Sequence, residues 1–173
     1  QVAVKKIPGG LFSSFINDTL KRGDAIEIMA PSGKFNVEVS DTKAKNYIAF
    51  AAGSGITPIL SIIKTHLAQE PNGTFKLFYL NRSVKSIIFK EEIEQLKNRY
   101  FGRFEIFHFL TKEHRFSELF NGRFTKEKLQ VLTDKIIDIS SVDECFICGP
   151  EDMIYLLRDE LTTAGLDKDK IHY

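Results

Sequence analysis

The sequence has few cysteines, almost no net charge and no long hydrophobic run, and each absence excludes a class of protein. Two cysteines in 173 residues do not make a disulfide scaffold, and they favour a reducing compartment. A net charge of +1 with both signs interspersed gives no basic face for nucleic acid. No apolar run reaches the roughly 20 residues that cross a bilayer, and no signal-peptide pattern opens the chain. We expect a cytoplasmic globular protein with no nucleic-acid or membrane partner.

Several catalytic and metal-binding motifs are also absent. The four histidines show no ligand spacing, so we predict no metal site, and a ferredoxin-type iron–sulfur cluster needs four cysteines. No Gly-x-Ser-x-Gly elbow and no Gly-x-x-x-x-Gly-Lys loop occurs, so the sequence shows neither the serine nucleophile of the first motif nor the phosphate-binding loop of the second. A short-chain dehydrogenase would need Tyr-x-x-x-Lys, and no tyrosine has a lysine four residues later.

A glycine-rich turn stands between a strand pattern and a helix pattern. An apolar run at 47–50 leads into Ala-Ala-Gly-Ser-Gly-Ile-Thr-Pro at 51–58, after which apolar residues recur on one helical face. Glycines let the backbone approach a dinucleotide pyrophosphate, and the N–H groups of the first helical turn point at the anion. The spacing departs from Gly-x-Gly-x-x-Gly at its last position, and a turn of this kind is often purely structural.

The remainder of the chain predicts an α/β fold. Continuous apolar runs at 47–52, 75–80, 104–110 and 145–148 are typical of a parallel sheet covered on both faces. Helical patterns separate them, Thr125 is placed to cap one helix, Gly165 is placed to end the last, and a fifth short strand is expected from Lys170. This alternation predicts a doubly wound, five-stranded parallel sheet.

The first 41 residues have a different pattern. Val2 and Val4, residues 24–30 and residues 35–39 alternate apolar with polar side chains, which predicts half-buried strands. A short helix is expected over 11–20, with Phe12, Phe15 and Ile16 on its apolar side. Polar residues 40–46 would link this region to the sheet. The sequence begins at Gln1 within a strand-like pattern, so we expect a piece of a longer protein.

The end of the second predicted strand favours NADP. In an NAD site an acidic residue at this place accepts hydrogen bonds from the ribose 2′-hydroxyl. Here the strand runs into Asn81-Arg82-Ser83, with no carboxylate before Glu91. The Arg82 guanidinium suits a 2′-phosphate, and Ser83 adds a hydroxyl donor. The alternative is an ordinary solvated arginine in a loop.

Two further motifs border predicted helices. Cys-x-x-Cys at 145–148 precedes Gly149-Pro150; the two cysteines point to opposite faces of a strand, so Cys148 would face the crevice beyond the strand ends while Cys145 lies in the core. A small buried hydrophobe remains the alternative for Cys148. The second motif, Pro-Gly-Gly-Leu-Phe-Ser-Ser at 8–14, would hold another phosphate or form a plain turn with a capping serine.

With these motifs in order, the chain resembles the ferredoxin–NADP reductase family of flavoprotein reductases, and within it the reductases of phenylacetate degradation. The resemblance rests on the combination of Pro-Gly-Gly-x-x-Ser-Ser, Pro-x-Gly-x-Phe, Ala-Gly-Ser-Gly-Ile-Thr-Pro, Asn-Arg-Ser and Cys-Gly-Pro-Glu-Asp-Met. It implies FAD and NADP as cofactors. The residues implied to hold the FAD pyrophosphate are Gly10, Leu11, Phe12 and Ser13. Those implied to bind NADP are Gly53, Ser54, Gly55, Ile56, Thr57, Asn81, Arg82, Ser83, Cys148, Gly149 and Pro150, with Cys148 and Thr57 in catalytic positions beside the nicotinamide.

The family resemblance also implies domains and a reaction. Residues 1–41 would be the last part of a FAD-binding antiparallel β-barrel, and residues 42–173 the NAD(P)-binding α/β domain. Hydride would pass from NADPH to FAD, and single electrons to an iron–sulfur centre that serves an oxygenase. Delivery to a separate ferredoxin or haem domain, and a non-catalytic nucleotide-binding module, remain alternatives. The family's Arg-x-Tyr-Ser flavin motif is absent from the sequence, and a [2Fe-2S] cluster would require a further domain.

Overall fold

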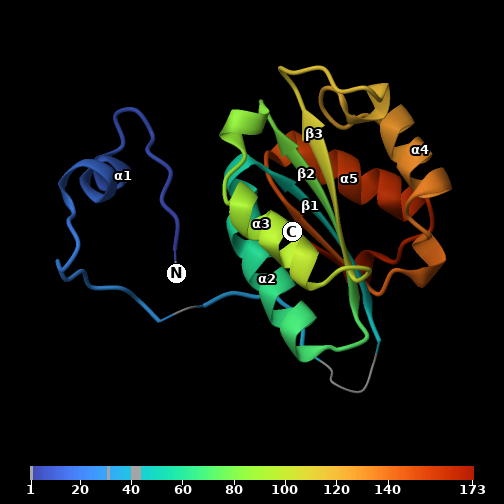
Figure 1. Cartoon of the computed structure of the whole chain (residues 1–173), viewed down its shortest axis with the longest axis horizontal. Coiled ribbons are helices and arrows are strands. Elements are labelled where there is room, and N and C mark those ends of the chain that lie inside the picture. Colours follow the sequence, from blue (N-terminus) through green and yellow to red (C-terminus); the bar gives the residue numbers. More distant parts are fainter. Residues whose placement is uncertain (1, 31, 40–43) are drawn as a thin grey trace. The chain divides into compact units, whose positions relative to one another are not determined.

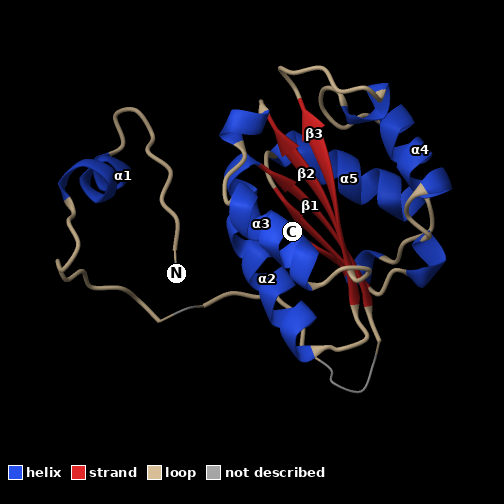
Figure 2. Ribbon diagram, viewed as in Figure 1, coloured by secondary structure: helices blue, strands red, loops and turns tan. Residues whose placement is uncertain are grey.

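The computed structural model describes residues 2–30, 32–39 and 44–173. The chain divides into two compact units, of which one ends at Lys34 and the other begins at Phe35. Figures 1 and 2 show that every strand of the described residues belongs to the second unit. The predicted boundary between residues 41 and 42 lies outside the described residues.

The second unit is built on a five-stranded parallel sheet with the order β3-β2-β1-β4-β5. Its strands are β1 (Asn46–Ala52), β2 (Thr74–Asn81), β3 (Phe104–Leu110), β4 (Glu144–Cys148) and β5 (Ile171–His172). The predicted doubly wound α/β fold is confirmed. The apolar runs form strands because both faces of the sheet are covered by helices.

Four helices of ten or more residues connect the strands: α2 (Ile56–Gln69), α3 (Lys90–Arg99), α4 (Lys126–Lys135) and α5 (Glu151–Thr163). Helices α2 and α3 pack on one face of the sheet, and α4 and α5 pack on the other (Figure 1). The predicted start of α4 is confirmed, since the Thr125 side chain accepts a hydrogen bond from Lys128 N–H. The predicted end of α5 is confirmed as well, since Gly165 has a left-handed φ of 103° just after this helix. None of the helices in the described parts is long and apolar enough to cross a membrane.

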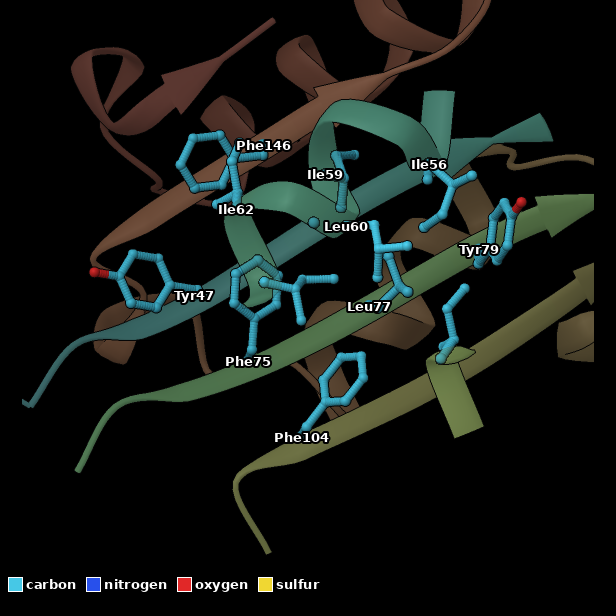
Figure 3. Packing of buried hydrophobic residues seen from close by; sticks show 14 of the residues in the cluster. Tyr47, Ile56, Ile59, Leu60, Ile62, Phe75, Leu77, Tyr79, Phe104 and Phe146 are labelled. Carbon is cyan, nitrogen blue, oxygen red and sulfur yellow. The ribbon is translucent and has the colours of Figure 1, made fainter. Parts of the chain in front are cut away.

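Each face of the sheet carries its own core. On the α4–α5 face, Phe50, Phe78 and Phe107 stack across three neighbouring strands, with ring centroids 4.8 Å and 5.0 Å apart. On the α2–α3 face, Ile56 and Leu77 lie among fully buried side chains (Figure 3). The strands are thereby held in one register, which sets the positions of the loops that follow them.

The N-terminal unit departs from the sequence-based expectations. The short helix is confirmed as α1 (Leu11–Ser14) followed by a π-helical turn at Phe15–Thr19, but its expected apolar side is open, with Phe12 67% and Phe15 44% exposed. The segments predicted as strands in residues 2–30 carry no strand. Residues 35–39, which belong to the second unit, carry none either, and Phe35 and Val37 pack against its α2–α3 core instead. An alternating pattern becomes a strand only when a neighbouring strand supplies hydrogen-bond partners, and the described part of the N-terminal unit supplies none.

Candidate nucleotide-binding site

The order of the strands reverses between β1 and β4. From β1 the chain goes outward to β2 and β3, whereas β4 lies on the other side of β1 and continues to β5. Ala51 of β1 pairs with Cys148, the last residue of β4. In open α/β sheets, ligands bind in the crevice beyond the carboxyl ends of the strands at this switch point. Two of the predicted motifs begin here.

The predicted glycine turn follows β1 directly. Gly53–Gly55 forms a 3-10 turn that runs without a break into α2. Gly53 has a left-handed φ of 51°, and a Cβ placed on it would meet nothing within 4 Å. The first N–H groups of such a helical run have no intrahelical partner and carry the positive end of the helix dipole. The turn therefore presents an open, electropositive backbone surface at the switch point.

Gly55 serves a different purpose from Gly53, because it lies directly against the end of β4. A Cβ on Gly55 would fall 2.1 Å from the carbonyl oxygen of Cys148 and 3.3 Å from its Sγ. A Cβ on Gly149 would fall 3.0 Å from the Cβ of Ala52. Glycine is needed at 55 for this close approach of two loops, which brings the turn after β1 and the Cys148-Gly149 turn into contact.

The two cysteines lie on opposite faces, as the strand geometry predicts. Cys145 is fully buried in the α4–α5 core, while Cys148 is half-buried beside Gly55. Burial raises the pKa of the Cys148 thiol, so this group is a neutral thiol and not a thiolate nucleophile. The hydroxyl of Thr57, in the first turn of α2, donates to the carbonyl oxygen of Ser54 at 3.1 Å. Pro150 is the exposed N-cap of α5.

The end of β2 holds the predicted phosphate-recognition residues. Asn81 is 5% exposed, and its Nδ2 is buried without a hydrogen-bond partner among the described residues. Arg82 is exposed, and its guanidinium has no ion-pair or hydrogen-bond partner within the described part of the chain. Ser83 begins a short turn in which its N–H donates to Ser86 Oγ at 3.0 Å. The carboxyl end of β2 therefore carries a buried amide at Asn81, followed in the chain by the unpaired guanidinium of Arg82.

Two residues that the sequence analysis missed belong to the same edge. Lys112 N–H donates to the carbonyl oxygen of Arg82 at 2.8 Å, which places a second cationic residue beside Arg82. Lys112 follows the predicted strand at 104–110, so examining the end of the third strand as well as the second would have found it. Tyr79, inside β2, donates its hydroxyl to the carbonyl oxygen of Gly53 at 3.0 Å. No sequence pattern indicates this bond.

The paired glycines of the predicted FAD motif lie in the N-terminal unit. Gly9 has a left-handed φ of 76°, and a Cβ on Gly10 would fall 2.6 Å from Ser13 Oγ. That hydroxyl is buried and accepts the N–H of Ile7 at 3.1 Å. The tight space at Gly10 is thus occupied by Ser13, while Leu11 and Phe12 are exposed. Whether this turn holds a phosphate stays a prediction.

Comparison with known proteins identifies the family. Residues 50–159 match the oxidoreductase NAD-binding domain, and this segment contains the switch point and both of its loops. The chain belongs to this family. Among the described residues, no cluster of His, Cys, Asp and Glu could hold a metal ion.

Relatives of this NAD-binding domain extend the match to nearly the whole chain. It is 39% identical to a subunit of 1,2-phenylacetyl-CoA epoxidase from Escherichia coli, over 99% of this chain and 48% of that protein. It is 31% identical to the ferredoxin reductase component of 3-ketosteroid-9-alpha-monooxygenase from Rhodococcus rhodochrous, over 99% of this chain and 45% of that protein. The chain thus spans about half the length of these relatives.

The relatives confirm the resemblance to ferredoxin–NADP reductases that the motifs indicated. Among solved structures, the flavohaem-like FAD/NAD-binding domain of nitric oxide dioxygenase from Vibrio cholerae superposes with a TM-score of 0.78 at 27% identity, covering 95% of this chain and 63% of that one. The chain is therefore an oxidoreductase NAD-binding domain, and its fold is that of ferredoxin–NADP reductases.

Proposed function

We propose that this chain is the nucleotide-binding portion of an NADPH-dependent flavoprotein reductase that supplies electrons to an oxygenase. The observation that carries the proposal is the contact between the Gly53–Gly55 turn and Cys148 at the switch point, with the unpaired Arg82 one strand away. When bound, the nicotinamide supplies a hydride and the flavin accepts it and releases single electrons. The residues of this chain bind, orient and shield the nucleotide.

The residues present fit a dinucleotide in two respects. The side of Gly53 where a Cβ would stand is empty, which leaves room for a pyrophosphate against the turn. The buried Nδ2 of Asn81 makes no hydrogen bond of standard geometry in the described residues, although the side chain interacts with the Tyr79 hydroxyl, and a buried donor of this kind is costly unless a ligand or water accepts from it. Asn81 would therefore donate to the adenosine end of the nucleotide, next to Arg82.

The preference for NADPH rests on charge. Arg82 and Lys112 place two cationic residues beside each other, and a guanidinium binds a phosphate through charge-assisted hydrogen bonds. A 2′-phosphate would occupy this corner, with Ser83 as a further donor. NADH lacks that phosphate and would leave both cations unpaired.

Replacement of Arg82 by alanine should weaken NADPH binding more than tenfold and leave NADH binding nearly unchanged. Hydrogen bonds to charged groups contribute about 1.5–3 kcal/mol, and 1.4 kcal/mol corresponds to a factor of ten. Titration calorimetry at fixed salt measures both affinities. Arg99→Ala, at the exposed end of α3, is the matched control and should change neither. Equal losses for both nucleotides would contradict the assignment of Arg82.

At the other end of the nucleotide, the turns that meet at the switch point would border the nicotinamide. Cys148, Gly149 and Pro150 follow β4, and Thr57 lies in the adjacent first turn of α2. The neutral Cys148 thiol, half-buried against Gly55, would pack on the ring and exclude water from the reacting face. Thr57, already oriented by its bond to Ser54, would help to fix the position of the ring.

The remaining assignments rest on the relatives and the motifs. One relative is a ferredoxin reductase component of a monooxygenase and another is a subunit of an epoxidase, which supports an oxygenase partner and an iron–sulfur acceptor. FAD would be bound in part by Gly10, Leu11, Phe12 and Ser13, with residues 1–41 as part of the flavin domain and residues 42–173 as the NADP domain. Delivery to a separate ferredoxin or haem domain is the alternative.

The visible absorption spectrum of the purified protein, before and after anaerobic addition of NADPH, tests the proposal directly. We expect flavin absorption bands that bleach when NADPH is added, because the nucleotide reduces the flavin. Bands that bleach equally fast with NADH would support a reductase but contradict the NADPH preference. A colourless protein that binds NADPH would instead support the nucleotide-binding module.

A further inference from the structure

Tyr79 is a fully buried tyrosine near the carboxyl end of β2. Figure 3 shows it at the arrowhead end of the strands beside Ile56, whereas Tyr47 lies at the opposite end of the same cluster. A buried phenolic hydroxyl normally finds a hydrogen-bond partner. The hydroxyl interacts with the Asn81 side chain, two residues along the same strand. Its two carbonyl partners belong to two different loops at the carboxyl end of the sheet.

The hydroxyl of Tyr79 lies between two carbonyl oxygens. It donates to Gly53 at 3.0 Å, and the carbonyl oxygen of Ile88 lies at 3.5 Å. Both carbonyls belong to left-handed turns, since Gly53 has a φ of 51° and Phe89, which follows Ile88, has a φ of 57°. A left-handed conformation costs a residue with a side chain about 1–2 kcal/mol, so the surroundings must hold Phe89 in place. One hydroxyl therefore touches the turn after β1 and the turn before α3.

The bond to Gly53 determines which way the next N–H points. A trans peptide is planar, with its carbonyl oxygen and its N–H on opposite sides. Because the Gly53 oxygen faces the buried hydroxyl, the N–H of Ser54 faces away from the core, toward the open side of the turn. Gly53 also accepts from Ile56 N–H, so both lone pairs of this oxygen are used. Burial raises the pKa of Tyr79 to about 12, and the hydroxyl remains a donor at every physiological pH.

We propose that Tyr79 is a positioning residue for nucleotide binding, whose hydroxyl holds the Gly53–Ser54 peptide with its N–H directed at the pyrophosphate. The inference rests on the proposed nucleotide-binding function of the glycine turn. Its effect is common to NADPH and NADH because both carry the pyrophosphate. This separates the role of Tyr79 from that of Arg82, which discriminates between them.

The variant Tyr79→Phe tests the proposal, because it keeps the ring and removes only the hydroxyl. We expect the dissociation constants of NADPH and NADH to rise by the same factor, roughly three- to tenfold for one hydrogen bond. Titration calorimetry on the purified chain measures both. Amide hydrogen exchange should also become faster at residues 53–55 and 88–90, where the two turns are released.

Tyr47→Phe is the matched control. It removes an equally buried hydroxyl from the same core cluster, one that donates to Glu70 Oε1 at 2.8 Å far from the crevice. It should lower stability without changing either dissociation constant. The role of Tyr79 would be overturned if Tyr79→Phe bound both nucleotides with wild-type affinity, or if Tyr47→Phe lost as much affinity as Tyr79→Phe. In either case the proposed nucleotide-binding function would still stand. A wild-type chain that bound neither nucleotide would overturn the proposed function and this inference together.

Discussion

Replacement of Gly55 by alanine should lower the free energy of unfolding by about 2–3 kcal/mol, in the upper part of the range for overpacking, and reduce NADPH affinity at least tenfold. The added methyl group would stand 2.1 Å from the carbonyl oxygen of Cys148 and 2.7 Å from its carbonyl carbon. Both are backbone atoms of a central strand and cannot rotate away. Relief of the clash requires the ends of β1 and β4 to separate, which distorts the switch point. Urea unfolding and titration calorimetry measure the two effects.

Gly53→Ala provides the matched comparison within the same turn. A Cβ at Gly53 meets nothing within 4 Å, but the left-handed φ of 51° strains any residue with a side chain. This strain costs about 1–2 kcal/mol, and the methyl group would project into the space assigned to the nucleotide. We therefore expect a smaller loss of stability than in Gly55→Ala, together with a clear loss of affinity. Wild-type stability and affinity in Gly55→Ala would show that the close approach of the two loops is dispensable.

Replacement of Arg103 by methionine should lower the free energy of unfolding by about 2–3 kcal/mol and leave nucleotide affinity unchanged. The guanidinium donates to the carbonyl oxygens of Leu67, Glu70 and Gly73 at 2.8, 2.6 and 3.1 Å. These carbonyls end α2 and form the turn into β2, so one cation satisfies groups that have no intrahelical partner and neutralises the negative end of the helix dipole.

Arg103 lies just before β3, at the end of the sheet opposite to the crevice, which explains why only stability should change. Methionine keeps much of the apolar side-chain volume, so the decrease in the free energy of unfolding measures the contribution of the charge and its hydrogen bonds. Arg99→Met, at an exposed position on α3, should leave the urea midpoint unchanged. A midpoint in Arg103→Met equal to that of the wild type would show that water replaces the guanidinium at no cost.

Much of the α/β unit could be predicted from the sequence because the relevant physics is local. A continuous apolar run such as 75–80 predicts a strand buried on both faces, and a glycine turn before a helical pattern predicts an anion-binding N-terminus. The opposite orientations of Cys145 and Cys148 follow from the period of a strand. The strands and the two cysteine orientations were confirmed, whereas anion binding stays a prediction. The strands expected in residues 24–30 and 35–39 were wrong, since alternation predicts a strand only where a pairing partner exists.

The sequence by itself determined the kind of each buried strand, the place of the glycine turn and the family to which the motifs belong. Only the tertiary structure decided that Gly55 touches Cys148, that Lys112 stands beside Arg82, and that Tyr79 holds the carbonyl of Gly53. The first set depends on backbone sterics and on periodicities within a short window of residues. The second depends on strand order and register, which bring together side chains that lie far apart along the chain, and which no local pattern records.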